Sequence, residues 1–116
     1  MSLLDDLREL GADVDEGLQR FMNNSSLYER MLKKLVASAN DLQVMPCFES
    51  GDLEKALANA HTLKGVTGNL SITPLYNAYS EIVSLLRENK PDEAKTKLEA
   101  ILPVEKKVME CIGKYI

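Results

Sequence analysis

The sequence lacks the residues that a disulfide scaffold, a metal centre or a membrane protein would require. Among its 116 residues are one histidine, two cysteines and no tryptophan. The cysteines, Cys47 and Cys111, do not form a CxxC pair, and with a single histidine they cannot complete a usual zinc ligand set. No segment approaches the roughly 20 apolar residues that span a membrane. We therefore expect two reduced thiols and no membrane insertion.

The sequence also lacks an excess of positive charge. Fourteen basic residues stand against eighteen acidic ones, which gives a formal net charge of -4, and the lysines and arginines are scattered along the chain. This distribution is unfavourable for binding a polyphosphate, so we expect no nucleic-acid partner. The amino terminus, MSLLDDLREL, carries acidic residues where a secretory signal needs basic ones, which favours a cytoplasmic protein.

Helical periodicity is the feature that the sequence has in abundance. Apolar residues recur three and four positions apart almost throughout, and no stretch alternates as a strand would. The length suits one domain, residues 1–116, that is large enough to bury its own core. These observations predict a single all-α domain.

Capping signals predict where the first helices begin. Asp13 followed by Glu16 predicts a capping box for a short helix, and Ser26 with Glu29 predicts the same arrangement for a longer one. Pro46 should end or kink the longer helix, because proline has no backbone donor and clashes with the preceding turn.

Three further helices follow the same rules. Asp52 should cap the first of them, Thr73 should cap the second with Pro74 at its first position, and the third should begin near Pro91 and be kinked or split at Pro103. The apolar positions of the helix capped by Asp52 are Leu53, Ala56, Leu57, Ala60, Leu63, Thr67 and Leu70. Four long helices with short connections predict an antiparallel up-down-up-down four-helix bundle, with short amino-terminal helices packed on one end.

The stretch AHTLKGVTGNL holds the only histidine and two glycines within one predicted helix. His61 lies about a third of a turn from the centre of the apolar stripe, so its ring should lie at the rim of the bundle. Gly65 and Gly68 follow on the same side, and each costs about 1 kcal/mol relative to alanine in a helix interior. The glycines either permit a close helix crossing beside a structural histidine or clear space beside a nucleophilic one. Lys64 favours the second explanation, because its ammonium group could stabilise the anionic oxygens of a phosphoryl group attached to the ring.

The sequence HTLKG, residues 61–65, resembles the HxLKG signature of histidine-containing phosphotransfer (HPt) domains of bacterial multistep phosphorelays. The similarity extends from Gly11 onward, through GADVDEGLQRF, LYERMLKKL and FESGDLEKALANAHTLKG. In that family the histidine takes a phosphoryl group from an aspartate of a receiver domain and passes it to another receiver.

The resemblance implies a role for each residue of the motif. His61 would be the phosphoacceptor, Lys64 the cation that steadies the phosphoryl group, and Gly65 the gap that admits the partner. Gly68 matches a small-residue position of the family. The implied partners are response-regulator receiver domains and a hybrid sensor histidine kinase. Mg²⁺ is expected in the partner receiver, while the chain, expected to be a monomer, would need no cofactor of its own.

The surface around the histidine should contact the partner. Leu57, Ala58 and Thr62 are candidates on the exposed side of the same helix, together with Gly65 and Gly68 of the motif. Arg87, on the following helix, could add positive charge to the site or could be an ordinary solvated arginine.

Two departures from the family pattern leave an alternative open. Ser71 stands where the family commonly has a glycine, ten residues after the histidine, and Val83 stands where many members have a glutamine or glutamate that holds the ring. The alternative is a non-phosphorylated helical adaptor of the same fold that binds a receiver or another signalling protein. The chain has neither a GxxxxGK[ST] loop nor a residue paired with His61 as in a hydrolase, so we expect no kinase or hydrolase activity of its own.

Overall fold

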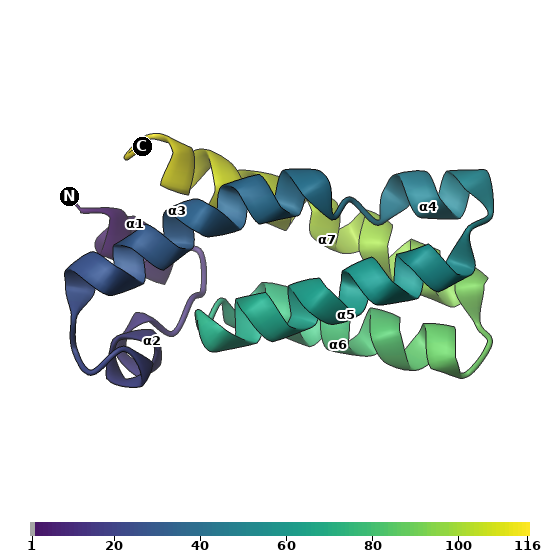
Figure 1. Ribbon diagram of the computed structural model, residues 1–116, viewed down its shortest axis with the longest axis horizontal. Helices are drawn as coiled ribbons and strands as arrows, with labels where there is room; N and C mark the ends of the chain where they lie inside the picture. The colour runs from purple at the N-terminus through teal and green to yellow at the C-terminus, as the bar shows by residue number, and fades with distance from the viewer. Residues whose placement is uncertain (1) are drawn as a thin grey trace.

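The computed structural model describes residues 2–116 and contains no strand in that range. Its helices, in chain order, are α1 (Leu3–Glu9), α2 (Val14–Arg20), α3 (Ser25–Asp41), α4 (Met45–Ser50), α5 (Leu53–Asn69), α6 (Thr73–Arg87) and α7 (Pro91–Gly113) (Figure 1). The prediction of an all-helical chain is therefore confirmed. None of these helices combines the length and the apolar character needed to cross a bilayer.

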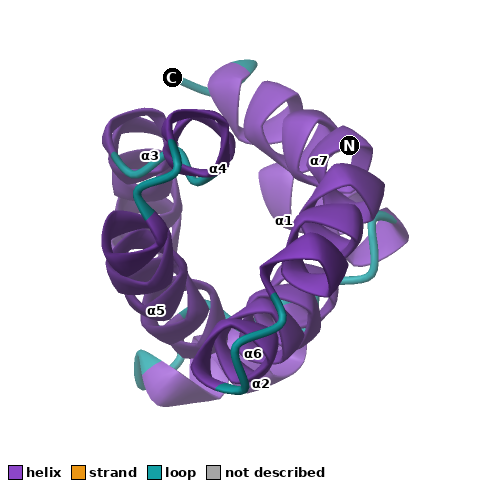
Figure 2. Ribbon diagram, turned by 90° about the vertical axis from the view of Figure 1, so that its right-hand side faces the viewer, coloured by secondary structure: helices purple, strands orange, loops and turns teal. Residues whose placement is uncertain are grey.

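The α5–α6 hairpin is the centre of the architecture. α6 packs along α5 on one side and along α7 on the other, while α3 runs beside α7 and the short α4 closes against α5 and α7. A view at right angles to that of Figure 1 shows the long helices around a common interior (Figure 2). α1 and α2 lie at one end, where α1 packs on α7 and α2 packs on α3.

Apolar side chains from every helix fill this interior. The largest fully buried side chains are Leu3, Leu7, Tyr28, Leu32, Leu35, Leu63, Ile72, Leu75, Tyr79, Ile82, Leu98 and Ile112. Of the apolar positions predicted for α5, Leu53 is the exception, because it lies at the first helical position and remains 38% exposed. Periodicity alone therefore places this side chain wrongly.

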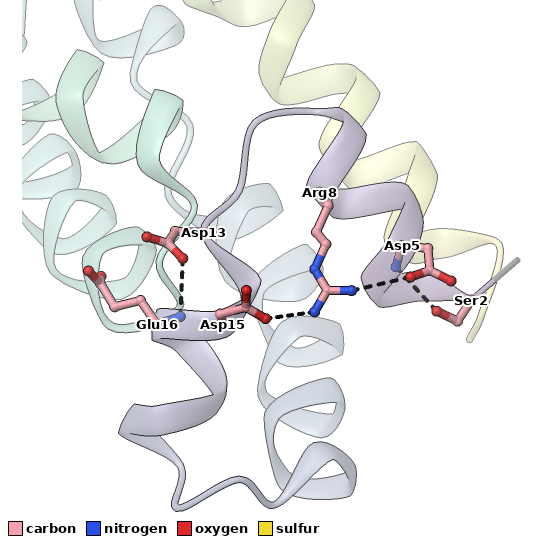
Figure 3. A network of polar contacts seen from close by, with 6 residues as sticks. All are labelled: Ser2, Asp5, Arg8, Asp13, Asp15 and Glu16. Atoms are coloured by element: carbon pink, nitrogen blue, oxygen red, sulfur yellow. Dashed lines mark hydrogen bonds and ion pairs between the residues drawn. The ribbon is translucent and has the colours of Figure 1, made fainter.

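The cap of α2 is only half of the predicted capping box. The Asp13 carboxylate accepts the backbone N–H of Glu16 at 3.1 Å, as expected (Figure 3). The Glu16 side chain does not return to the cap, because the Asp13 N–H donates instead to the carbonyl of Ser71 at 2.9 Å. The cap thus connects α2 to the α5–α6 turn.

Arg8 links the two short helices at the same end of the molecule. Its guanidinium reaches Asp5 of α1 at 3.3 Å and Asp15 of α2 at 2.8 Å (Figure 3). All three side chains are largely exposed, so each ion pair contributes at most about 1 kcal/mol.

The start and the end of α3 both differ from the prediction. Asn24 caps the helix by accepting the N–H of Leu27 at 3.1 Å, two residues before the predicted cap, Ser26. The helix ends at Asp41, well before Pro46, which lies in the first turn of a separate helix, α4. Proline suits a first turn because no hydrogen bond is required of its nitrogen there, so Pro46 helps to begin α4 and does not end α3.

The later helices largely match the prediction. Asp52 caps α5 by accepting the N–H of Lys55 at 3.1 Å. Thr73 was predicted as the cap of α6 but is the first residue of that helix. The cap is Ile72, whose side chain makes no capping hydrogen bond. A kink or a split was predicted at Pro103. α7 continues through this residue as one helix, so the split is wrong.

A buried tyrosine ties α2, α3 and the α5–α6 turn together. The Tyr28 ring is fully buried, and its hydroxyl donates to the carbonyl of Leu70 at 2.6 Å. Burial raises the pKa of this phenol to about 12. The ring lies directly against Gly17 of α2, where even a β-carbon would overlap it. α2 can therefore approach α3 closely only because residue 17 has no side chain.

We predict that Gly17→Ala lowers the free energy of unfolding by about 1–3 kcal/mol, the usual cost of an overpacked core. Gly113→Ala is the matched control, because a β-carbon at that position in α7 meets open space. Chemical denaturation followed by circular dichroism measures both variants. Equal stability of Gly17→Ala and the wild-type chain would contradict this packing.

Candidate functional site

His61 lies in the middle of α5 with an exposed side chain, at the edge of a hollow of about 610 Å³. Residues of α2, α5, α6 and the α5–α6 turn line this hollow, which we call the His61 hollow. Four of the predicted site residues meet there, namely His61, Lys64, Gly65 and Gly68. The hairpin positions these residues because α5 is continuous from its cap at Asp52 to its end at Asn69.

The two nitrogen-bearing side chains of the predicted motif are those of His61 and Lys64. Within residues 2–116, the His61 ring makes no hydrogen bond and the half-buried Lys64 makes no salt bridge. Partial burial strengthens the interaction of an ammonium group with an anion, because less water screens it. The pair can therefore offer a nucleophilic ring nitrogen and a nearby positive charge to an incoming group.

The two glycines of α5 serve different purposes. A β-carbon at Gly65 would meet no atom within 4 Å, so this residue leaves open space beside the ring. A β-carbon at Gly68 would lie 2.8 Å from Cδ1 of Tyr76, whose ring covers that glycine from α6. Gly68 therefore permits a close approach of α6 to α5, while Gly65 leaves space beside the histidine.

Val83 cannot hold the histidine ring by a hydrogen bond. Its apolar side chain is buried in the core, only 1% exposed. No other side chain within residues 2–116 takes over that hydrogen bond. Within residues 2–116, no hydrogen bond therefore fixes the orientation of the ring.

Ser71, the other departure from the family pattern, adopts a backbone conformation that usually belongs to glycine. Its φ is 56°, in the left-handed region, which costs a residue with a side chain roughly 1–2 kcal/mol. In return, its buried hydroxyl donates to Oε1 of Glu16 at 2.8 Å. The same carboxylate oxygen accepts from the Arg20 guanidinium at 3.3 Å. The hydrogen bond from Ser71, and to a smaller extent the one from Arg20, lowers the pKa of Glu16 below its usual value.

Sequence reasoning did not assign Arg20, Glu16 or Tyr76 to the site, although all three line the His61 hollow. Glu16 and Arg20 are spaced i, i+4, a signal that indicates a helical ion pair but not what lies beside it. Only the packing of α2 against the α5–α6 turn brings them to the hollow.

The remaining predicted contact residues lie outside the His61 hollow. Ala58 and Thr62 are exposed on α5, and the Thr62 hydroxyl donates to the Ala58 carbonyl at 3.1 Å. Leu57 is half-buried one turn before the histidine, and Arg87 is the exposed last residue of α6. Their contact with a partner stays a prediction.

A second, more apolar hollow of about 630 Å³ lies between α3 and α5. Its apolar lining consists of Phe21, Met31, Leu35, Val66 and Leu70. Arg20 and Asn69 line both hollows, so the two hollows adjoin at these residues.

Comparison with known proteins identifies the family. The family model of the Hpt domain matches residues 2–108 of the 116-residue chain, from α1 well into α7, and so includes the whole His61 hollow. No curated protein and no solved structure matches the chain significantly. Hpt domains act with receiver domains in phosphorelays. The chain belongs to the Hpt domain family, whose members carry out phosphotransfer in phosphorelay signalling.

Proposed function

We propose that His61 accepts a phosphoryl group from the aspartyl phosphate of a receiver domain and passes it to another receiver. The observation that carries this proposal is an exposed imidazole that makes no hydrogen bond within residues 2–116, beside Lys64 and the open space at Gly65. A nucleophile that must meet a group on another protein needs this accessibility.

The transfer requires little chemistry from the chain itself. A ring nitrogen of neutral His61 attacks the phosphorus with its lone pair, a nitrogen–phosphorus bond forms, and the bond between phosphorus and the aspartyl oxygen breaks. The aspartate leaves as a carboxylate. Lys64 offsets the negative charge of the phosphoryl oxygens, and in-line placement contributes most of the rest. The reverse sequence returns the group to a second receiver.

The family also implies where, and with which partners, the chain would act. The chain would act as a cytoplasmic monomer without a cofactor of its own, and the receiver would hold Mg²⁺. α3, α5, α6 and α7 would be the four helices of the up-down-up-down bundle. A hybrid sensor histidine kinase would supply the phosphoryl group through its receiver. Leu57, Ala58, Thr62 and Arg87 would extend the contact surface around the hollow.

One observation favours a second candidate, the non-phosphorylated adaptor. Residues 2–116 provide no hydrogen bond that orients the His61 ring, and Val83 is buried. An adaptor would bind a receiver through the same surface without forming phosphohistidine.

We predict that a phosphorylated receiver labels the wild-type chain with acid-labile, alkali-stable phosphate and that His61→Gln abolishes the label. The test is clean because the chain has no other histidine. Since His61 is exposed, the free energy of unfolding of the variant should differ from that of the wild type by no more than about 0.5 kcal/mol. Binding of the receiver without any label on the wild-type chain would favour the adaptor, and equal labelling of His61→Gln would refute the assigned residue.

We predict that Lys64→Ala slows phosphoryl transfer at least about tenfold, because a charge-assisted contact to the phosphoryl oxygens is lost. Lys55→Ala, on the exposed start of α5, is the matched control and should transfer at the wild-type rate. Rapid-quench measurements give the rate of transfer. Equal rates for the two variants would remove Lys64 from the site.

We predict that Gly65→Ala stabilises the chain by about 0.5–1 kcal/mol and yet slows transfer from a receiver, because alanine favours the helix but fills the space beside the ring. Gly68→Ala should gain less stability or lose some, because Tyr76 must move away. Thermal unfolding and transfer rates of both variants test this. Faster transfer by a more stable Gly65→Ala chain would contradict the proposed use of the space.

A further inference from the structure

Arg20 lies at the junction of the two hollows. It is the last residue of α2, its side chain is 50% exposed, and it lines both the His61 hollow and the apolar hollow between α3 and α5. A protein that covers His61 and extends toward α3 therefore meets this guanidinium. Lys34 adds a second positive charge on the far side, where it lines the apolar hollow.

A chain of hydrogen bonds holds Arg20 at this junction. The buried Ser71 hydroxyl donates to Oε1 of Glu16 at 2.8 Å, and Nη2 of Arg20 donates to the same oxygen at 3.3 Å. The Ser71 carbonyl also accepts the Asp13 N–H at 2.9 Å, which fixes the start of α2 on the α5–α6 turn. α2 cannot shift relative to His61 without breaking these bonds.

Most N–H donors of the Arg20 guanidinium have no partner within residues 2–116 and can bind an incoming group. Arginine has five N–H donors in a fixed fork, and within residues 2–116 the Arg20 guanidinium bonds only to Glu16. The acidic groups of the hollow are already engaged, since Asp13 caps α2 and Glu16 accepts from Ser71 and Arg20. An approaching anion therefore finds Arg20 and Lys64 available, while both carboxylates are occupied.

We propose that Arg20 is a docking cation for the acidic, phosphate-bearing face of the partner, and that Glu16 and Ser71 are the residues that position it. This inference rests on the proposed function, because a donor of aspartyl phosphate presents a phosphoryl group and the carboxylates that hold its metal ion. Charges at the rim of an interface mainly change the rate of association and its dependence on salt. Arg20 therefore acts on capture of the partner, and the chemical step belongs to His61 and Lys64.

The test is a steady-state transfer assay with a phosphorylated donor receiver at low and high salt, in which an excess of a second, unphosphorylated receiver takes the phosphoryl group from His61 and regenerates the chain. We expect Arg20→Ala to raise KM about fivefold at about 0.05 M salt with kcat unchanged, and the difference to shrink at about 0.5 M salt because ions screen the contact. Arg30→Ala, an exposed arginine of α3 outside both hollows, is the control and should leave KM at the wild-type value. An Arg20→Ala chain with the wild-type KM overturns the inference.

Ser71→Gly separates positioning from stability. Glycine relieves the left-handed conformation at φ 56° but removes the hydroxyl that holds Glu16. We expect an unchanged or higher melting temperature together with a KM raised about two- to threefold at low salt. A residue that only supports the fold would move KM and stability together, so an unchanged KM in a more stable Ser71→Gly chain overturns the positioning role.

Two further outcomes separate the alternatives. If Arg20 contacts the partner and not the phosphoryl group, label on His61 should decay at the same rate in Arg20→Ala as in the wild type once the receiver is removed; a changed rate would overturn the docking role. A wild-type chain that takes no label refutes the proposed function itself. A labelled wild type that Arg20→Ala matches in KM refutes only this inference.

Discussion

The buried hydrogen bond from the Tyr28 hydroxyl to the Leu70 carbonyl holds together the parts of the chain that frame the site. It joins the start of α3 to the end of α5 across the interior, and the absence of a side chain at Gly17 lets α2 close over the same ring. With α2 held there, the Asp13 N–H reaches the carbonyl of Ser71 and fixes the α5–α6 turn. The hollow beside His61 exists because these three parts of the chain cannot separate independently.

The site places a reactive side chain, that of His61, on a fixed backbone. α5 is anchored by buried Ala56, Ala60 and Leu63 on its inner side, so the backbone that carries His61 is fixed even though its ring makes no hydrogen bond within residues 2–116. Gly65 costs helical stability relative to alanine, and it leaves open space beside that ring. A carrier that must meet successive partners profits from such a division, because the frame does not change between one partner and the next.

Much of the fold and the centre of the site could be predicted from the sequence, because both depend on local patterns. Helical periodicity predicted an all-α chain, and the cap at Asp52 predicted the start of α5. Three residues of the HTLKG motif, His61, Lys64 and Gly65, line the hollow. The sequence did not predict α4, because Pro46 reads equally well as the end of one helix or the first turn of another. Nor did it predict Arg20 beside His61, since that proximity requires the long-range bonds through Glu16 and Ser71 that no local pattern encodes.

The central claim is that a nitrogen of His61 forms a covalent bond to phosphorus. The most direct measurement is ³¹P NMR of the ¹⁵N-labelled chain after reaction with a phosphorylated receiver. If His61 is the phosphoacceptor, a new phosphorus resonance appears that is coupled to nitrogen, disappears in acid and is absent from His61→Gln. If the receiver loses its phosphate to water in the presence of the folded chain, without any nitrogen-coupled phosphorus signal, His61 is not a phosphoacceptor.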